Sequence, residues 1–180
     1  DVRAMARVVS VSDATVRDII RRTKLSVGAF YNYYRSKEEV FQALADDGAR
    51  RFKPILHAQY ENATDAESYL RAAVRAYFTF SAGEQENWRL RRPAGEAVPH
   101  ANDTPEIRAV FEEVRMVFAD IMDRGLAPKV DLDYFAAASI AIAREVCDKM
   151  LERRPVDIEA AVEFTVRLIL GGLPALTRTD

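Results

Sequence analysis

The chain has 180 residues, 49% of them hydrophobic and 30% charged, and a formal net charge of −2. This apolar content can fill the core of one or two compact units, and no apolar run reaches the length of a membrane span. No secretory signal is visible and Cys147 is the one cysteine, so an internal disulfide framework is excluded and a cytoplasmic location is expected. Cys147 is expected to be a small buried hydrophobe.

The first residues indicate the end of a helix. Val2, Met5, Ala6 and Val9 keep helical spacing over residues 1–10. Because Asp1 is not an initiator methionine, we expect further residues upstream and a first helix that is truncated in this sequence.

Two short helices with a tight connection follow. Thr15 can cap a helix that ends near Thr23, and Ser26 is a good N-cap for a helix over 27–33. Helices joined by so few residues must cross steeply, as in a helix-turn-helix. The next helix is expected to begin at Ser36, whose hydroxyl forms a capping box with Glu39.

The helix over 27–33 has an unusual surface for a purely structural element. Its first residues are small and lie at the positive end of the helix dipole, where a phosphate or a base edge can approach closely. Phe30 and Tyr34 can point inward, which leaves Tyr31, Asn32 and Tyr33 facing outward. This pattern favours DNA contacts. The alternative is a small helical domain that needs aromatic residues only for packing.

The charge distribution agrees with DNA binding by the N-terminal part. Residues 1–53 contain 11 Lys or Arg against 7 Asp or Glu, a net charge of +4, whereas residues 54–180 have a net charge of −6. A polyanion would therefore bind the N-terminal part more readily.

The runs TVRDII and LSVGAFYNYYRSKEEV resemble the DNA-binding domain of the TetR family of bacterial transcriptional regulators. The resemblance implies an all-α fold, with a three-helix helix-turn-helix domain over 1–53 and a larger helical ligand-binding and dimerisation domain over 54–180. It implies that Arg17 can reach a base and that the base-facing positions of the recognition helix are Val27, Gly28, Ala29 and Asn32. It implies phosphate contacts from Tyr31, Tyr33 and Lys37. The expected DNA-binding residues are Thr15, Arg17, Ser26, Val27, Gly28, Ala29, Tyr31, Asn32, Tyr33 and Lys37.

The remaining pattern predicts only helices. The helix after Ser36 runs to about Tyr60, and Pro54 should kink or restart it. Further helices are expected after a capping box at 64–67, after Thr104-Pro105, after Asp131 and from about Asp157. The glycines at 83 and 125 and the pair at 171–172 are the expected ends of three of them.

The last two helices have apolar surface left over, which suggests pairing with a second copy of the chain. The resemblance also implies a homodimer built on these helices, placing two recognition helices on a palindromic site in double-stranded operator DNA. An intramolecular core covering both faces is the alternative. The expected interface residues are Ala137, Ala138, Ala141, Ile142, Val162, Leu168 and Ile169.

An apolar pocket among the middle helices would hold a small, largely apolar ligand, as the resemblance implies. The expected lining is Tyr77, Phe78, Trp88, Phe111, Phe118, Met122 and Phe135. The sequence thus predicts a ligand-responsive regulator, most simply a repressor released by an inducer.

The second hypothesis is a helical small-molecule-binding protein or an enzyme without specific DNA binding. His57 and His100 are the only histidines, and neither belongs to a nucleophile or zinc motif, so no catalytic residue, metal or cofactor is predicted. Specific DNA binding would separate the two hypotheses.

Overall fold

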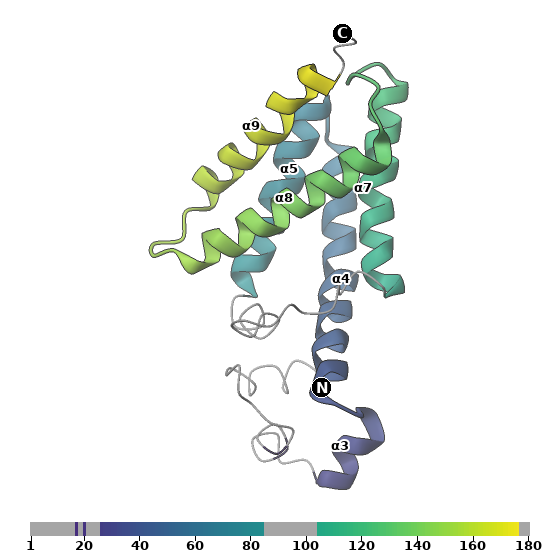
Figure 1. The fold of residues 1–180 in the computed structure, drawn as a ribbon, viewed down its shortest axis with the longest axis vertical. Coiled ribbons are helices and arrows are strands. Elements are labelled where there is room, and N and C mark those ends of the chain that lie inside the picture. Colours follow the sequence, from purple (N-terminus) through teal and green to yellow (C-terminus); the bar gives the residue numbers. More distant parts are fainter. Residues whose placement is uncertain (1–16, 18–19, 21–25, 85–103, 177–180) are drawn as a thin grey trace. The chain divides into compact units, whose positions relative to one another are not determined.

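The computed structural model describes residues 17, 20, 26–84 and 104–176, and these residues form α-helices and no strand (Figure 1). The predicted all-α fold is confirmed. The helices are α3 (Val27–Tyr33), α4 (Lys37–Glu61), α5 (Ala66–Gly83), α7 (Pro105–Asp123), α8 (Leu132–Glu152) and α9 (Ile158–Leu176). The predicted tail of a first helix over 1–10 lies outside the described residues.

The described residues fall into two compact units, and α4 contributes to both. The first unit contains α3 and α4 up to Arg50, and the second contains Arg51–Gly83 together with the residues from Arg108 onward. The domain division at 53 and 54 stays a prediction.

Side-chain caps fix most helix starts where the sequence predicts them. Each cap is a side-chain oxygen that accepts a hydrogen bond from the backbone N–H three residues later, which satisfies a donor that the helix itself leaves unpaired. The caps at the predicted starts are Ser26 (3.1 Å to Ala29), Ser36 (3.3 Å to Glu39), Thr104 (3.3 Å to Ile107), Asp131 (3.0 Å to Tyr134) and Asp157 (3.0 Å to Ala160). Short-range signals of this kind need no tertiary information.

Two predicted capping boxes differ in detail. The carboxylate of Glu39 accepts from the N–H of Arg35 at 2.6 Å, one residue before the cap. At the start of α5, Asp65 and not Thr64 is the cap, because its carboxylate accepts from the N–H of Ser68 at 2.7 Å. The Ser68 hydroxyl in turn accepts from the N–H of Thr64 at 3.0 Å, so the box is shifted by one residue.

The predicted restart at Pro54 and the predicted helix end at the glycines 171–172 are wrong, because both helices run on, whereas a kink at Pro54 stays a prediction. Pro54 lies inside α4 on its exposed side, where the carbonyl of Arg50 that loses its helical partner can reach water. The glycines at 171–172 lie inside α9, which ends only at Leu176. Two glycines cost about 2 kcal/mol in a helix, whereas burying Ile169 and Leu173 on either side contributes about 1.5–3 kcal/mol each, so burial wins.

The predicted ends of α5 and α7 are confirmed. α5 ends at Gly83. After α7, Gly125 adopts a φ of +71°, and the N–H groups of Gly125 and Leu126 donate to the carbonyls of Met122 (3.1 Å) and Ile121 (3.0 Å). This is a Schellman motif, which requires a left-handed residue and therefore favours glycine.

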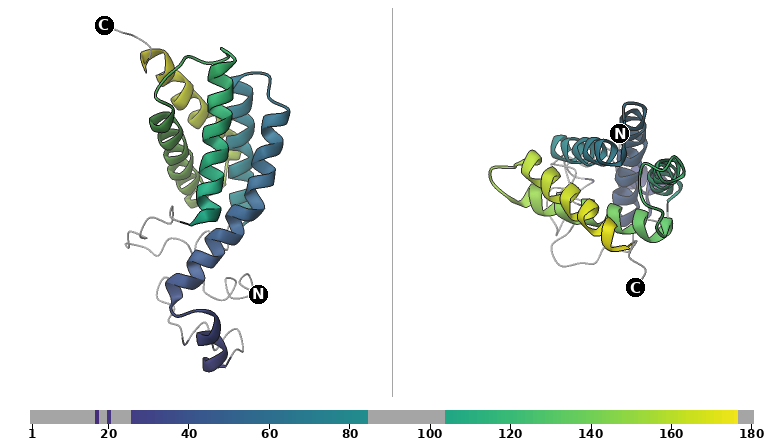
Figure 2. Two further views of the ribbon diagram at one scale, coloured as in Figure 1. Left: turned by 90° about the vertical axis from the view of Figure 1, so that its right-hand side faces the viewer. Right: turned by 90° about the horizontal axis from the view of Figure 1, so that it is seen from above.

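The second unit is built around α5. The helix packs against α8 and α9, which lie side by side across it (Figures 1 and 2). Aromatic rings link three helices in its interior, since the centroid of the Phe118 ring on α7 lies 5.9 Å from that of Tyr69 on α5 and 4.9 Å from that of Phe135 on α8. Ion pairs from Arg71 to Glu163 and from Arg75 to Glu159, both 2.6 Å, tie α5 to α9 at the surface. These contacts hold the framework in which the pocket described below is formed.

Candidate DNA-binding surface and ligand pocket

The short helix α3 is held by one buried aromatic residue. Phe30 is fully buried, and its ring contacts Tyr31 edge-on at 5.3 Å and Tyr34 at 6.0 Å between centroids. Burial also raises the pKa of Tyr34. The predicted inward direction of Phe30 therefore agrees with the structure, and the helix can expose the rest of its surface.

The exposed side of α3 carries most of the residues predicted to contact DNA. Val27 is 59% exposed, Tyr31 53% and Tyr33 78%, and Gly28 and Asn32 are exposed as well. Tyrosines exposed to this extent have hydroxyl donors suited to phosphate oxygens. Asn32 has the side-chain amide that pairs with an adenine edge.

Gly28 has no structural need to be glycine. A Cβ placed on it would meet no atom within 4 Å, and it lies in regular helix, where glycine costs about 1 kcal/mol relative to alanine. The fold of the subunit does not require glycine at this position. The missing side chain is consistent with close approach of a partner molecule to the backbone of α3.

The other predicted DNA contacts are placed only in part. Ser26 uses its hydroxyl as the N-cap of α3, Ala29 is half-buried, and Arg17 is helical with an exposed side chain. Lys37 is the first residue of α4, but its side chain and the whole of Thr15 lie outside the described residues.

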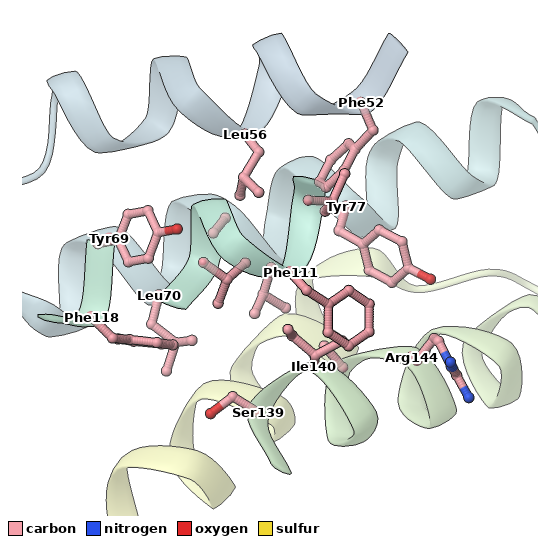
Figure 3. A pocket seen from close by; sticks show the side chains of 15 residues that line it. Phe52, Leu56, Tyr69, Leu70, Tyr77, Phe111, Phe118, Ser139, Ile140 and Arg144 are labelled. Atoms are coloured by element: carbon pink, nitrogen blue, oxygen red, sulfur yellow. The ribbon is translucent and has the colours of Figure 1, made fainter. Parts of the chain in front are cut away.

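An apolar pocket of about 160 Å³ lies within the second unit (Figure 3). Four helices line it, with Phe52 and Leu56 from α4, Tyr69, Leu70, Ala73, Val74 and Tyr77 from α5, Val110, Phe111, Val114 and Phe118 from α7, and Ser139, Ile140, Ala143 and Arg144 from α8. Its two ends differ, since Figure 3 shows Tyr69 and Phe118 at one end and Tyr77 and Arg144 at the other. The pocket can accept an apolar group and offers polar contacts only near its ends.

The predicted pocket lining is partly displaced. Tyr77, Phe111 and Phe118 line the pocket, whereas Phe78, Met122 and Phe135 are buried elsewhere in the core. Trp88 lies outside the described residues. The aliphatic lining residues Leu70, Ala73 and Val74 form part of the apolar stripe of α5 that the sequence shows, but Tyr69 and Ser139 carried no signal as pocket residues.

Two hydroxyl groups in this lining have no hydrogen-bond partner. They are the phenol of Tyr69 and the hydroxyl of Ser139, on residues that are 1% and 5% exposed. Burial raises the pKa of Tyr69, and the nearby carboxylate of Glu113 raises it further. Tyr69 therefore stays a neutral hydrogen-bond donor.

An ion pair joins α4 to α7 beside this region. The carboxylate of Glu113, almost fully buried, lies 2.5 Å from Nδ1 of His57, a contact that raises the pKa of His57. One helical turn further along α4, the Tyr60 hydroxyl donates to Asp120 at 2.6 Å. The two contacts set the spacing between α4 and α7 along one wall of the pocket.

The exposed side of α8 and α9 carries apolar and small residues next to the charged residues Arg144, Glu145 and Arg167. Phe164 is 59% exposed and Leu168 50%, and the glycines at 171–172 lie on the same exposed side of α9. On α8, the predicted interface residues Ala137, Ala138 and Ala141 are exposed and Ile142 is half-buried. We call this the α8–α9 face.

Two predicted interface residues point the other way. Val162 is fully buried and Ile169 is 5% exposed, so both pack inside the subunit and cannot supply the α8–α9 face. Phe164 is exposed instead, on the same side of α9 as Leu168 one turn later.

Cys147 is fully buried and is a free thiol, and burial raises its pKa to about 12. It is thus a core residue. Within the described ranges, no group of three or more His, Cys, Asp or Glu side chains is arranged to hold a metal ion, and no helix is both long and apolar enough to cross a membrane.

The sequence pattern of bacterial regulatory proteins of the tetR family matches residues 9–44, which include α3 and its flanks. The HTH-type transcriptional activator FasR of Mycolicibacterium smegmatis is 25% identical over 162 residues, which cover 89% of this chain and 74% of that protein.

Solved structures share the fold over almost the whole chain. The fatty acid degradation regulator FadR from Bacillus halodurans has a TM-score of 0.76 at 20% identity, covering 96% of this chain and 97% of that one. FadR from Bacillus subtilis, in complex with stearoyl-CoA, has a TM-score of 0.77 at 13% identity, covering 95% and 96%.

Proposed function

The chain belongs to the TetR family of bacterial transcriptional regulators, and we propose that it is a homodimeric repressor that binds a palindromic operator and is released by a small molecule with an apolar chain. The observation that carries this proposal is the surface of α3. A helix held by one buried ring and exposing its remaining aromatic, amide and glycine residues is suited to contact DNA.

The DNA-binding part of the proposal assigns two kinds of contact. Tyr31 and Tyr33 would position the protein on phosphate groups, whereas Asn32 would read a base edge. Loss of a phosphate contact should weaken binding to all sequences alike, and loss of a base contact should change sequence preference.

A gel-shift assay on the promoter region of the protein's own gene, repeated at several salt concentrations, tests this assignment. Tyr33→Ala should weaken binding to the operator and to unrelated DNA by a similar factor, while Asn32→Ala should lose about 5- to 150-fold of its preference for one base. Met116→Ala, an exposed apolar residue of α7, is the control and should bind as the parent does. If both α3 variants bound like the parent, α3 would not be the recognition helix.

The homodimer is proposed from the α8–α9 face. Exposed Phe164 and Leu168 beside small residues allow the helices of a second copy to pack closely. A contact of the same face with itself gives twofold symmetry, which matches a palindromic site.

Sedimentation in the analytical ultracentrifuge tests the dimer. Phe164→Glu together with Leu168→Glu should convert a micromolar dimer to monomer, because four carboxylates would be buried in one symmetric contact. Met116→Glu changes an equally exposed apolar residue outside the α8–α9 face and should leave the dimer intact. A parent protein that sediments as a monomer at micromolar concentration would contradict the proposal.

The ligand is proposed to be a fatty acyl compound. The solved regulator from Bacillus subtilis binds stearoyl-CoA, and the pocket of this chain is lined almost entirely by apolar side chains. At about 160 Å³ the pocket is smaller than the roughly 300–1,000 Å³ of typical ligand sites, so a long chain can enter only if the helices around it separate. A ligand that fits one arrangement better than the other shifts the protein toward it, which is the coupling that release from DNA requires.

Thermal unfolding with stearoyl-CoA tests the ligand, with free coenzyme A as control. At a hundred times its Kd the acyl compound should stabilise the protein by about 2.7 kcal/mol, raising Tm by about 5–11 °C. The same concentration should release the operator in a gel shift. A Tm shift with coenzyme A alone would place the binding outside the apolar pocket.

A transcriptional activator is the second candidate, because the curated relative from Mycolicibacterium smegmatis is an activator. A reporter gene behind the operator separates the two. Deleting the regulator raises expression if it represses and lowers it if it activates.

A further inference from the structure

The two unpartnered hydroxyls in the pocket are exceptions within this unit. Tyr60 and Thr165 have hydroxyls that find partners, since Tyr60 donates to Asp120 at 2.6 Å and Thr165 donates to the carbonyl of Ala161, one turn earlier in α9, at 2.8 Å. The same turn-back bond is the ordinary solution for a buried helical serine, yet Ser139 does not make it. Leaving a buried hydroxyl unpaired costs about 1–3 kcal/mol.

Figure 3 shows Tyr69 and Ser139, the residues that carry the two hydroxyls, toward the same end of the pocket, away from Arg144. The Phe118 ring contacts the ring of Tyr69 and also the ring of Phe135, which is one helical turn before Ser139 on α8. Figure 3 shows the hydroxyl of Tyr69 directed in among the lining side chains. Tyr69 thus directs its hydroxyl into an otherwise apolar space, and Ser139 lies at the same end of it.

The other end of the pocket is marked by Tyr77 and the exposed Arg144. Tyr77 follows Tyr69 by eight residues on α5, which corresponds to about 12 Å along the helix. A ligand that enters beside Arg144 would therefore place its apolar chain along the pocket and its far end near Tyr69 and Ser139.

We infer that the far end of the ligand chain carries an oxygen function, a hydroxyl or a carbonyl, that hydrogen-bonds to Tyr69 and Ser139. This inference rests on the proposed apolar-chain ligand and narrows its chemistry. A plain hydrocarbon end would leave both hydroxyls unpaired in the complex, whereas an oxygen at that position satisfies them and is selected over the plain chain.

The inference has a consequence for the free protein. If the Tyr69 hydroxyl serves a ligand, removing it from the unliganded protein removes an unpaired polar group and should not destabilise the fold. Tyr69→Phe should then leave Tm unchanged or raise it by about 2–4 °C. Tyr60→Phe, which removes a partnered hydroxyl from the same unit, should lower Tm and is the matched control. A lower Tm for Tyr69→Phe would assign the hydroxyl a structural or water-binding role and overturn the inference.

Binding of matched probes gives the second test. Octanoic, decanoic and dodecanoic acids are compared with their ω-hydroxy forms by titration calorimetry on the parent protein, Tyr69→Phe and Ser139→Ala. The parent should prefer the hydroxylated form of at least one chain length by about 5- to 150-fold. A variant that carries both substitutions should lose that preference while binding the plain acid at least as well.

The outcomes separate this inference from the proposed function. If the parent binds plain and hydroxylated chains with equal affinity, the inference of an oxygen at the far end of the ligand is overturned. The proposal of a regulator with an apolar ligand is then unaffected. Failure of every probe to bind overturns both the polar end and the acyl-chain ligand, and the gel shift then reports independently whether the protein binds an operator.

Discussion

Filling the pocket should lock the protein in its ligand-free arrangement. Ala73 lies on α5 in the pocket lining, so Ala73→Leu adds three carbon atoms to the empty space. At about 0.8 kcal/mol per buried carbon this contributes about 2.4 kcal/mol. Fixing the leucine side chain costs about 0.5–1 kcal/mol, which leaves a net gain of about 1.5–2 kcal/mol. For a chain of this size Tm should rise by about 3–8 °C.

The same substitution should abolish the response to ligand, because the added side chain occupies the space that an acyl chain would take. The assay compares Tm with and without stearoyl-CoA and then operator release by gel shift. Ala76→Leu is the control, since Ala76 lies on the same helix but lines a separate hollow with Ile55 and Phe80. A variant that is less stable than the parent, or that still responds to stearoyl-CoA, would refute the assignment of this space as the ligand site.

The remaining predictions concern α3 and the contact between α4 and α7. Gly28→Ala should raise Tm, because alanine is favoured over glycine by about 1 kcal/mol in a helix, and should weaken operator binding in a gel shift; unchanged DNA affinity would remove close approach as the reason for this glycine. His57 has a raised pKa through its hydrogen bond and charge interaction with Glu113, with a smaller contribution from Glu61 and an opposing one from Lys53. Its stabilisation should be fully present below about pH 6.5 and lost as pH rises through the raised pKa. The difference in Tm between the parent and His57→Gln should therefore shrink from pH 6 to pH 9, and a difference that grows over this range would contradict the pairing.

The local signals in the sequence predicted the local structure well. Ser26 and Asp131 are caps because a side-chain oxygen meets an N–H three residues later, and nothing distant affects that choice. The buried side of α3 was predicted equally well, since Phe30 is the one residue of this helix that is buried.

The arrangement of α9 could not be predicted in the same way. This helix is apolar on most sides, so helical periodicity does not say whether Val162 and Ile169 or Phe164 and Leu168 face the core. The answer depends on how α9 crosses α5 and α8. The lining of the pocket could not be predicted for the same reason, because residues from four helices meet there. Tyr69 differs from other core tyrosines only in what surrounds its hydroxyl, which the sequence does not show.

The ligand pocket also bears on how long the protein survives in the cell. A ligand that binds only the folded protein, at a hundred times its Kd, contributes about 2.7 kcal/mol, a large part of the 5–15 kcal/mol by which such folds are stable. The unliganded regulator should therefore unfold more often and be degraded faster than the liganded one. In the proposed repressor, ligand would then lengthen the lifetime of the molecules that it removes from the operator. The pool that accumulates would restore the proposed repression quickly once the ligand is consumed.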